Sequence, residues 1–204
     1  MGFYQDHIVP HLISLAMRKA IFAPYRRRTV SAARGRVLEI GIGSGLNLPF
    51  YSGAVSQVIG IDPSSRLLAM ARGAKGQAAF DVSLVEGSAE AIPLETGDID
   101  TVVTTWTLCS IPDVAGALRE MRRVLKPGGR LLFVEHGRAL EPGVRAWQDR
   151  LTPVWRRIGG GCHLNRAIDE LIEGAGFAIE RLVIGHVRGP KPLTFMYEGA
   201  ARPR

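Results

Sequence analysis

The stretch Val37-Leu38-Glu39-Ile40-Gly41-Ile42-Gly43-Ser44-Gly45 decides the fold of this chain. Its apolar run leads directly into three glycines, and a second apolar run, Val58-Ile59-Gly60-Ile61, ends at Asp62. A buried strand followed by a glycine loop, and then a strand that ends in a carboxylate, is typical of the nucleotide-binding edge of a doubly wound sheet. Glycines let the backbone approach a ligand closely, and the Asp62 carboxylate can accept hydrogen bonds from both hydroxyls of a ribose.

Two details favour a cationic ligand over a dinucleotide. The third glycine of the dinucleotide fingerprint would fall at position 46, which is Leu46, so the spacing here is Gly-x-Gly-x-Gly. Glu39 stands beside the loop, where its carboxylate would repel a pyrophosphate and attract a positive charge. S-adenosylmethionine carries an ammonium and a sulfonium and no phosphate. These residues therefore favour this methyl donor over NAD.

Strand and helix patterns alternate along the rest of the chain. Strands are expected near residues 36–40, 56–61, 80–86, 99–104, 130–135, 179–184 and 193–199, and helices near 46–52, 65–73, 113–124, 143–157 and 164–175. The alternation predicts an α/β, Rossmann-like, doubly wound sheet of seven mostly parallel strands with helices on both faces. Residues 1–33 are expected to form a helical lid, with one helix from about Phe3 to Ile21 and another after Pro24, ahead of the donor-binding domain at residues 34–204.

The composition is that of one soluble domain, with 204 residues of which 46% are hydrophobic and 22% charged. No apolar run reaches the roughly 18 residues that span a bilayer, and no signal-peptide pattern opens the chain, so we expect a cytoplasmic protein. Cys109 and Cys162 are too few for a disulfide scaffold and lack metal-ligand spacing. We therefore expect reduced thiols and no metal.

The net charge of +7 gathers ahead of the glycine loop, at Arg18, Lys19, Arg26, Arg27, Arg28, Arg34 and Arg36. Charge runs of this kind are usually a solvated surface. Peripheral contact with an anionic membrane is the alternative that an amphipathic basic segment leaves open. The run lacks the interleaved aromatic residues of single-strand binders, which disfavours nucleic acid as a partner.

Further motifs carry a family resemblance: VLEIGIGSG at 37–45, GID at 60–62, GSAEAIP at 87–93, DTVVTT at 100–105 and RVLKPGGRLLFVEH at 123–136. With them the chain resembles a class I S-adenosylmethionine-dependent methyltransferase, with a methyltransferase domain of type 11, along nearly its whole length. LCSIPD at 108–113, EHGR at 135–138, WQDRLTPVWRRIGGGCHLNR at 147–166 and GPKPLTFMYEGAA at 189–201 resemble a narrower group, which includes the methyltransferase-like alkyl thiol S-methyltransferases.

The resemblance implies a site for S-adenosylmethionine, with S-adenosylhomocysteine as the product. The methionine part would be lined by Glu39, Gly41 and Gly43, and the ribose would be held by Asp62. The adenine edge would be followed by Pro63, Ser64, Ser88 and Ala89, and the methyl group would face Thr104 and Thr105. Many relatives have Asp-Ala where this chain has Ser88-Ala89, and the shorter, uncharged Ser88 lacks the carboxylate with which that Asp accepts a hydrogen bond from the adenine amino group.

Residues at strand ends and in a glycine-rich loop late in the chain are the candidates for contacting the methyl acceptor. A general base is needed only when the nucleophile arrives protonated. His136 after the fifth strand and His163 after Gly159-Gly160-Gly161 are the candidates, and a structural role is open for each. Trp106, Trp147 and Trp155 would suit an apolar acceptor or the protein core.

We expect methyl transfer to a small, fairly apolar acceptor. A thiol is the first choice because it is already partly ionised at neutral pH. One alternative is N- or C-methylation of a phospholipid head group or a quinone. Another is a donor-binding regulatory or membrane-surface protein without turnover.

Overall fold

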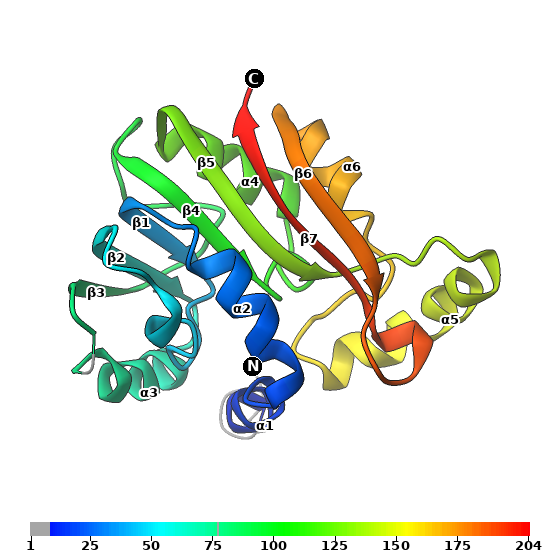
Figure 1. Cartoon of the computed structure of the whole chain (residues 1–204). Coiled ribbons are helices and arrows are strands. Elements are labelled where there is room, and N and C mark those ends of the chain that lie inside the picture. Colours follow the sequence, from blue (N-terminus) through cyan, green and yellow to red (C-terminus); the bar gives the residue numbers. More distant parts are fainter. Residues whose placement is uncertain (1–8, 77) are drawn as a thin grey trace.

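A computed structural model describes residues 9–76 and 78–204 of the chain. Seven strands form one sheet in the order β3-β2-β1-β4-β5-β7-β6, and β7 is antiparallel to both of its neighbours while β1 to β5 are parallel (Figure 1). The strands are β1 Gly35–Ile40, β2 Val55–Asp62, β3 Asp81–Glu86, β4 Ile99–Thr105, β5 Leu125–His136, β6 Phe177–His186 and β7 Phe195–Pro203. The predicted doubly wound α/β fold is confirmed.

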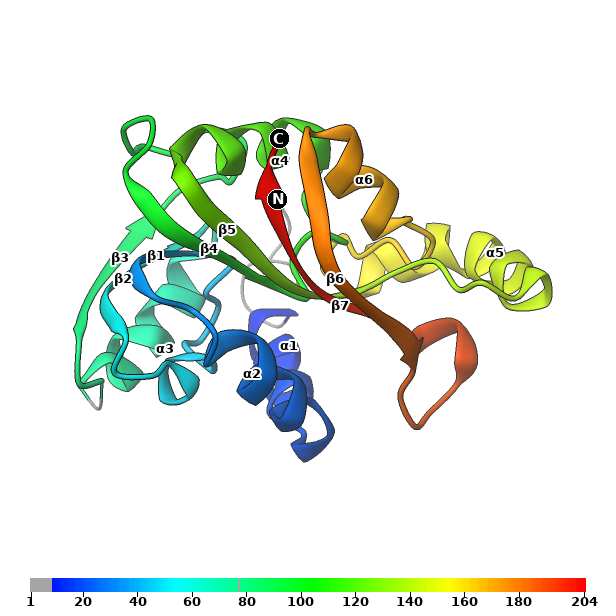
Figure 2. The same ribbon diagram turned by 45° about the horizontal axis from the view of Figure 1, so that its top comes forward.

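The helices cover both faces of the sheet (Figures 1 and 2). Alternate residues of a strand point to opposite faces, so Val37 packs with Val30 of α2 and Leu68 of α3, while Leu38 packs in the core that Leu118 of α4 shares with α6. The helices are α1 Val9–Met17, α2 Ala23–Val30, α3 Ser65–Lys75, α4 Val114–Val124, α5 Pro142–Ile158 and α6 Ile168–Gly174, with 3-10 turns at Ala20–Phe22, Leu48–Phe50 and Lys191–Leu193.

Helix starts follow local side-chain caps. The Ser64 hydroxyl accepts a hydrogen bond from the Leu67 N–H at the start of α3, and the Asp113 carboxylate accepts one from the Gly116 N–H at the start of α4. The cap predicted at Asp113 is thus confirmed. These caps fix where α3 leaves the end of β2 and where α4 begins after the turn that follows β4.

Three element predictions differ from the structure. The helix expected near 46–52 is only the 3-10 turn Leu48–Phe50, because Pro49 lacks the N–H that a longer helix would use and Tyr51 already has an extended backbone. Helix α6 begins at Ile168 rather than near 164, since the preceding residues form the loop that carries Arg166 to the turn after β4. The long N-terminal helix ends at Met17 instead of Ile21, and its expected start at Phe3 lies outside the described residues.

The parallel strands β1, β2, β4 and β5 all end at the same edge of the sheet, which we call the carboxyl edge. Ile40, Asp62, Thr105 and His136 are the last residues of these strands. Ligands of open α/β sheets bind at this edge, where the glycine loop after β1 also lies. The opposite, amino edge carries the starts of the same strands.

Candidate functional site

The glycine loop after β1 has a backbone that only glycine adopts readily. Gly41 and Gly43 have φ angles of +66° and +57°. A methyl group on Gly41 would collide with the side chain of Thr107, whereas one on Gly43 would have no neighbour closer than 3.9 Å. The loop is therefore packed against the protein at Gly41 and open at Gly43, where a ligand can approach the backbone. This openness fits the predicted donor site.

Asp62 ends β2 directly beside the loop, with 5% of its surface exposed. One carboxylate oxygen accepts the Gly43 N–H and the other accepts the Ser64 N–H, each at 2.9 Å. Burial raises the pKa of Asp62, and these two N–H groups oppose the rise. Each carboxylate oxygen has two lone pairs, so both can still accept a hydroxyl. Asp62 is thus held in one orientation, with both of its oxygens able to accept further hydrogen bonds.

Glu39 is buried at the centre of a polar network on the carboxyl edge. Its carboxylate accepts hydrogen bonds from Nδ2 of Asn47 at 2.8 Å and from the hydroxyl of Tyr51 at 2.7 Å. Burial raises the pKa of Glu39 to about 7, against the opposing effects of Tyr51, Asn47 and the Arg26 guanidinium. A cationic ligand nearby would favour the ionised form. Glu39 therefore holds Asn47 and Tyr51 in place, and its part in donor binding stays a prediction.

Arg26 of α2 enters this network from the N-terminal segment. It is 5% exposed, donates to Oδ1 of Asn47 at 3.0 Å and lies over the Trp106 ring at 4.7 Å. Burial lowers its pKa to about 10, and Glu39 opposes that change. The predicted solvated basic surface is wrong for this residue, and no sequence pattern distinguishes Arg26 from its neighbours. Arg28 of the same run is ion-paired with buried Glu198 at 2.7 Å.

The N-terminal helices lie at the carboxyl edge. The hydroxyls of Ser14 in α1 and Ser44 in the glycine loop are 2.9 Å apart, and the Phe22 ring packs edge-on against Trp106. Figures 1 and 2 show both helices next to the ends of β1 and β4. However, Leu12 and Leu15 of α1 remain 51% and 67% exposed. The apolar face of α1 is thus only partly used in packing on the rest of the chain.

Glu135 organises the segment that follows β4. It is fully buried in β5 and accepts hydrogen bonds from the Thr104 hydroxyl and from the N–H groups of Thr107 and Leu108, at 3.2 Å and 3.0 Å for the two N–H groups. Burial raises its pKa to about 7. Thr104 is therefore engaged with Glu135, while the Thr105 hydroxyl accepts from Asn47 at 2.9 Å. We did not select Glu135 from the sequence, although an acidic residue inside an apolar strand is itself a signal.

Two polar side chains at this edge are buried without partners. His136 is 7% exposed, and neither of its ring nitrogens makes a hydrogen bond of normal geometry to a described residue. The indole N–H of Trp106 also has no partner in the described part of the chain, and Trp106 has a φ of +54°. Buried polar groups are normally hydrogen-bonded, and unusual backbone geometry gathers at functional sites. Both features indicate a ligand position beside Trp106 and His136.

His163, the second candidate base, serves the loop in which it lies. Its backbone N–H donates to the carbonyl of Cys109 at 2.8 Å, and its Nδ1 lies 3.1 Å from the same oxygen. Burial and the nearby Arg166 guanidinium lower the pKa of His163. Only Nε2 of this ring is therefore left for other chemistry.

The residues predicted to follow the adenine edge are spread around the end of β2. Ser64 caps α3, Pro63 is exposed and Ala89 is buried. The exposed Ser88 hydroxyl donates to Glu90 at 3.0 Å and accepts from the Glu90 N–H at 3.2 Å. Ser88 thus closes a local turn, and its role toward adenine stays a prediction.

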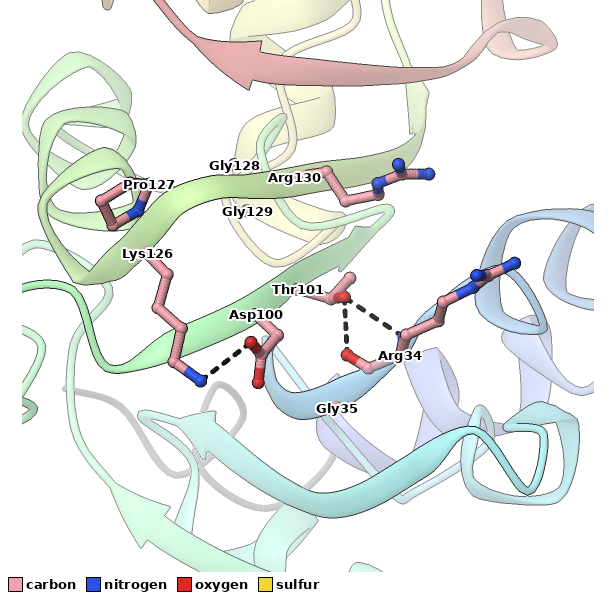
Figure 3. Close-up of a pocket in the computed structure, with 9 residues that line it drawn as sticks. All are labelled: Arg34, Gly35, Asp100, Thr101, Lys126, Pro127, Gly128, Gly129 and Arg130. Carbon is pink, nitrogen blue, oxygen red and sulfur yellow. Dashed lines mark hydrogen bonds and ion pairs between the residues drawn. The ribbon is translucent and has the colours of Figure 1, made fainter.

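A cavity of about 370 Å³ lies at the amino edge, away from these residues (Figure 3). Within it, Nζ of Lys126 lies 2.8 Å from Asp100, and the Thr101 hydroxyl donates to the Arg34 carbonyl at 2.9 Å. None of the predicted site residues lines it. We interpret it as the open end of the sheet rather than as the donor site.

Among the described residues there is neither a cluster of metal ligands nor a helix that could span a membrane. Within residues 9–76 and 78–204, no three His, Cys, Asp or Glu side chains lie close enough to hold a metal ion. No helix in the same part of the chain is long and apolar enough to cross a bilayer.

Comparisons with known proteins agree with this geometry. A family model described as a methyltransferase domain matches residues 38–133. Thiol S-methyltransferase TMT1B of Homo sapiens is 32% identical over 188 residues, which are 89% of this chain and 74% of that protein. Phosphatidylethanolamine N-methyltransferase of Cereibacter sphaeroides is 38% identical over 116 residues, 54% of this chain and 57% of that protein. A solved S-adenosylmethionine-dependent methyltransferase from Methanosarcina mazei has the same fold, with a TM-score of 0.68 and 20% identity over 91% of this chain and 97% of that one.

Proposed function

The chain belongs to the class I S-adenosylmethionine-dependent methyltransferases, in the family that includes the thiol S-methyltransferases, and on this premise we propose that it methylates the sulfur of a small, apolar thiol. The observation that carries the proposal is the buried imidazole of His136 at the carboxyl edge, whose ring nitrogens make no hydrogen bond of normal geometry to a described residue, although the ring lies close enough to Cys162 to stabilise its thiolate. A thiol offers a proton that such an imidazole can accept. The similarity to TMT1B over most of the chain supports sulfur as the acceptor atom.

The residues of the donor site fit S-adenosylmethionine, which when bound supplies an electrophilic methyl group on its sulfonium. Gly43 allows close approach, Asp62 is oriented for the ribose hydroxyls, and Glu39 provides a buried negative charge. Arg26 lies near enough to Glu39 to influence its ionisation and is a candidate partner for the carboxylate of the methionine part. The donor would be held by charge at one end and by hydroxyl contacts at the other.

The chain's part in the reaction is to position the acceptor and to remove its proton. Trp106 offers an apolar ring beside the end of β4, and Glu135 fixes the turn that follows. A ring nitrogen of His136 would take the proton from the thiol. A thiol with a pKa near 8.5 is about 3% ionised at pH 7, so complete ionisation raises its rate by at most about 30-fold. The remaining acceleration would come from proximity and orientation.

The acceptor class is tested with matched compounds that share one carbon skeleton. Hexanethiol, hexanol and hexylamine are each incubated with the protein and S-adenosylmethionine, and S-adenosylhomocysteine and the methylated product are measured. Only the thiol should give product at a substantial rate. Phosphatidylethanolamine vesicles and a demethylated quinone test the two alternatives, and faster turnover of either would replace the thiol proposal. Donor binding without product from any acceptor would favour a regulatory protein.

The role of His136 is tested by the pH dependence of thiol methylation. With an acceptor thiol whose pKa is near 8.5, His136→Gln should lower the rate up to about 30-fold at pH 7 and have little effect near pH 9, where most of the thiol ionises unaided. His163→Gln tests the other candidate in the same way. His186→Gln is the matched control, because His186 pairs with Glu141 at 3.1 Å and lies at the end of β6. A loss that is equal at all pH values would show that His136 is structural.

We also propose that the protein contacts anionic membranes peripherally, with two helices as the contact surface. Trp147, Leu151, Val154 and Ile158 lie on one face of α5 and are 56%, 38%, 60% and 53% exposed. Arg150 lies over Trp147 at 5.8 Å, and exposed Arg18 and Lys19 follow α1 with its exposed leucines. An apolar stripe with flanking arginines is typical of helices that lie in the membrane interface.

Flotation with vesicles tests this contact. The protein should float with vesicles that contain phosphatidylglycerol and not with pure phosphatidylcholine, and added salt should weaken the association. The double variant Leu151→Glu, Val154→Glu should not float with the phosphatidylglycerol vesicles. Val183→Glu is the control, because Val183 is 56% exposed on β6 and lies outside the two helices. Equal flotation of all three proteins would refute the assignment to α5.

A further inference from the structure

The only two cysteines of the chain meet beside the predicted acceptor position, although they lie far apart in the sequence. Cys109 stands in the turn after β4, and Cys162 ends the loop that begins with Gly159-Gly160-Gly161. The hydrogen bond from the His163 N–H to the Cys109 carbonyl joins the two segments at 2.8 Å. Both cysteines are free, and they lie close enough for Cys109 to influence the ionisation of Cys162.

The two sulfurs have different surroundings. Cys109 is 3% exposed, whereas Cys162 is only half-buried and so is the more accessible of the two. Cys109, the His136 ring and Trp155 all stabilise the Cys162 thiolate, which lowers the pKa of Cys162 while that of Cys109 is raised. An accessible thiolate beside a second, protonated cysteine is the arrangement found in peroxide-sensitive proteins.

We propose that Cys162 and Cys109 form a reversible disulfide on reaction with hydrogen peroxide, and that this bond slows methyl transfer by tying the 159–163 loop to the turn after β4. The bond would draw the Cys162 sulfur away from His136. It would also restrain the turn that carries Trp106 and Thr107, which border the donor site. The inference goes beyond methyl transfer and does not depend on the identity of the acceptor.

The chemistry takes place in two steps. The Cys162 thiolate attacks one oxygen of hydrogen peroxide, the O–O bond breaks, and a sulfenic acid forms together with hydroxide, which takes up a proton to become water. The Cys109 sulfur then attacks the Cys162 sulfur. The S–S bond forms as the S–O bond breaks, and the departing hydroxide leaves as water with the Cys109 proton. Two thiols thereby lose two electrons, and one peroxide is reduced to two waters. A small dithiol reverses the change by thiol–disulfide exchange.

The test uses the full chain, hydrogen peroxide as oxidant, and catalase to remove the excess. After unfolding in urea, iodoacetamide should label two cysteines in the reduced protein and none in the peroxide-treated protein, and dithiothreitol should restore both. Peptide mapping without reduction should show one link between the peptides that contain Cys109 and Cys162. Cys109→Ser should instead accumulate a sulfenic acid at Cys162 that dimedone traps, while Cys162→Ser should keep Cys109 reduced. Thermal unfolding establishes that each variant is folded.

The effect on activity is read from the start of the reaction. A thiol acceptor would itself reduce the disulfide, so the oxidised enzyme should begin with a lag that dithiothreitol pretreatment removes. An acceptor that is not a thiol should show a steady loss of rate instead. Links between molecules in place of the internal one, or oxidation of Cys109 in Cys162→Ser at the wild-type rate, would overturn the proposal. An internal disulfide without any lag or loss of rate would overturn its effect on methyl transfer.

Discussion

Replacing Asp62 by Asn should weaken the binding of S-adenosylmethionine by at least ten-fold. Each Asp62 oxygen accepts one backbone N–H at 2.9 Å and retains a lone pair for a ribose hydroxyl. Asn keeps one oxygen but presents an NH₂ group, which cannot accept, in place of the other. The loss of one hydrogen bond to a charged group costs about 1.5–3 kcal/mol, which is about 10- to 150-fold in Kd. Asp62→Ala removes both contacts and should weaken binding further.

Titration calorimetry with S-adenosylmethionine measures the loss, and thermal unfolding shows whether each variant is folded. Some destabilisation is expected, because the N–H of Gly43 loses its acceptor in the Ala variant. Asp100→Asn is the matched control, since Asp100 lies at the amino-edge cavity and should leave donor affinity unchanged. Unchanged affinity in both folded Asp62 variants, or a loss confined to Asp100→Asn, would refute the placement of the donor at the carboxyl edge.

Three further predictions concern charge and the N-terminal helix. A bound cation should hold Glu39 ionised, so a pKa of about 7 in the free protein predicts roughly ten-fold tighter donor binding at pH 8 than at pH 6. Calorimetry should show this rise in donor affinity, and Glu39→Gln should abolish it. Burial also raises the pKa of Glu135 to about 7, so the protonated form of Glu135 favours the folded state. Its contribution to the stability of the fold is complete below its unfolded pKa near 4.5 and is lost as the pH rises through 7. The free energy of urea unfolding should therefore fall by up to about 3 kcal/mol from this group between pH 4.5 and 7, and Glu135→Gln should flatten that fall. Deletion of residues 1–19 should abolish turnover and leave donor binding measurable, because α1 touches the glycine loop. The deletion keeps α2, whose Val30 is fully buried in the core. Full activity of the shortened protein would contradict the proposed lid.

Local patterns were sufficient where the chemistry lies within one element or at its end. The run into Gly41 and Gly43 and the carboxylate at Asp62 are each visible in a short stretch, and the rule that parallel strands end together brings them to one edge. The capping residue Asp113 is likewise local. The helix expected near 46–52 is wrong because the backbone becomes extended at Tyr51, whose hydroxyl donates to buried Glu39.

The doubly wound sheet, its carboxyl edge and the carboxylate at the end of β2 can all be predicted from the sequence, because periodicity and turn chemistry act between near neighbours. Only the tertiary structure decided which distant side chains share that edge. It buried Arg26 against Trp106, set Glu135 under the turn after β4, and brought Cys162 to Cys109. These contacts depend on how helices and loops pack across the ends of the strands. No spacing along the chain specifies them, since the same residues would be ordinary surface charges or core side chains in another packing.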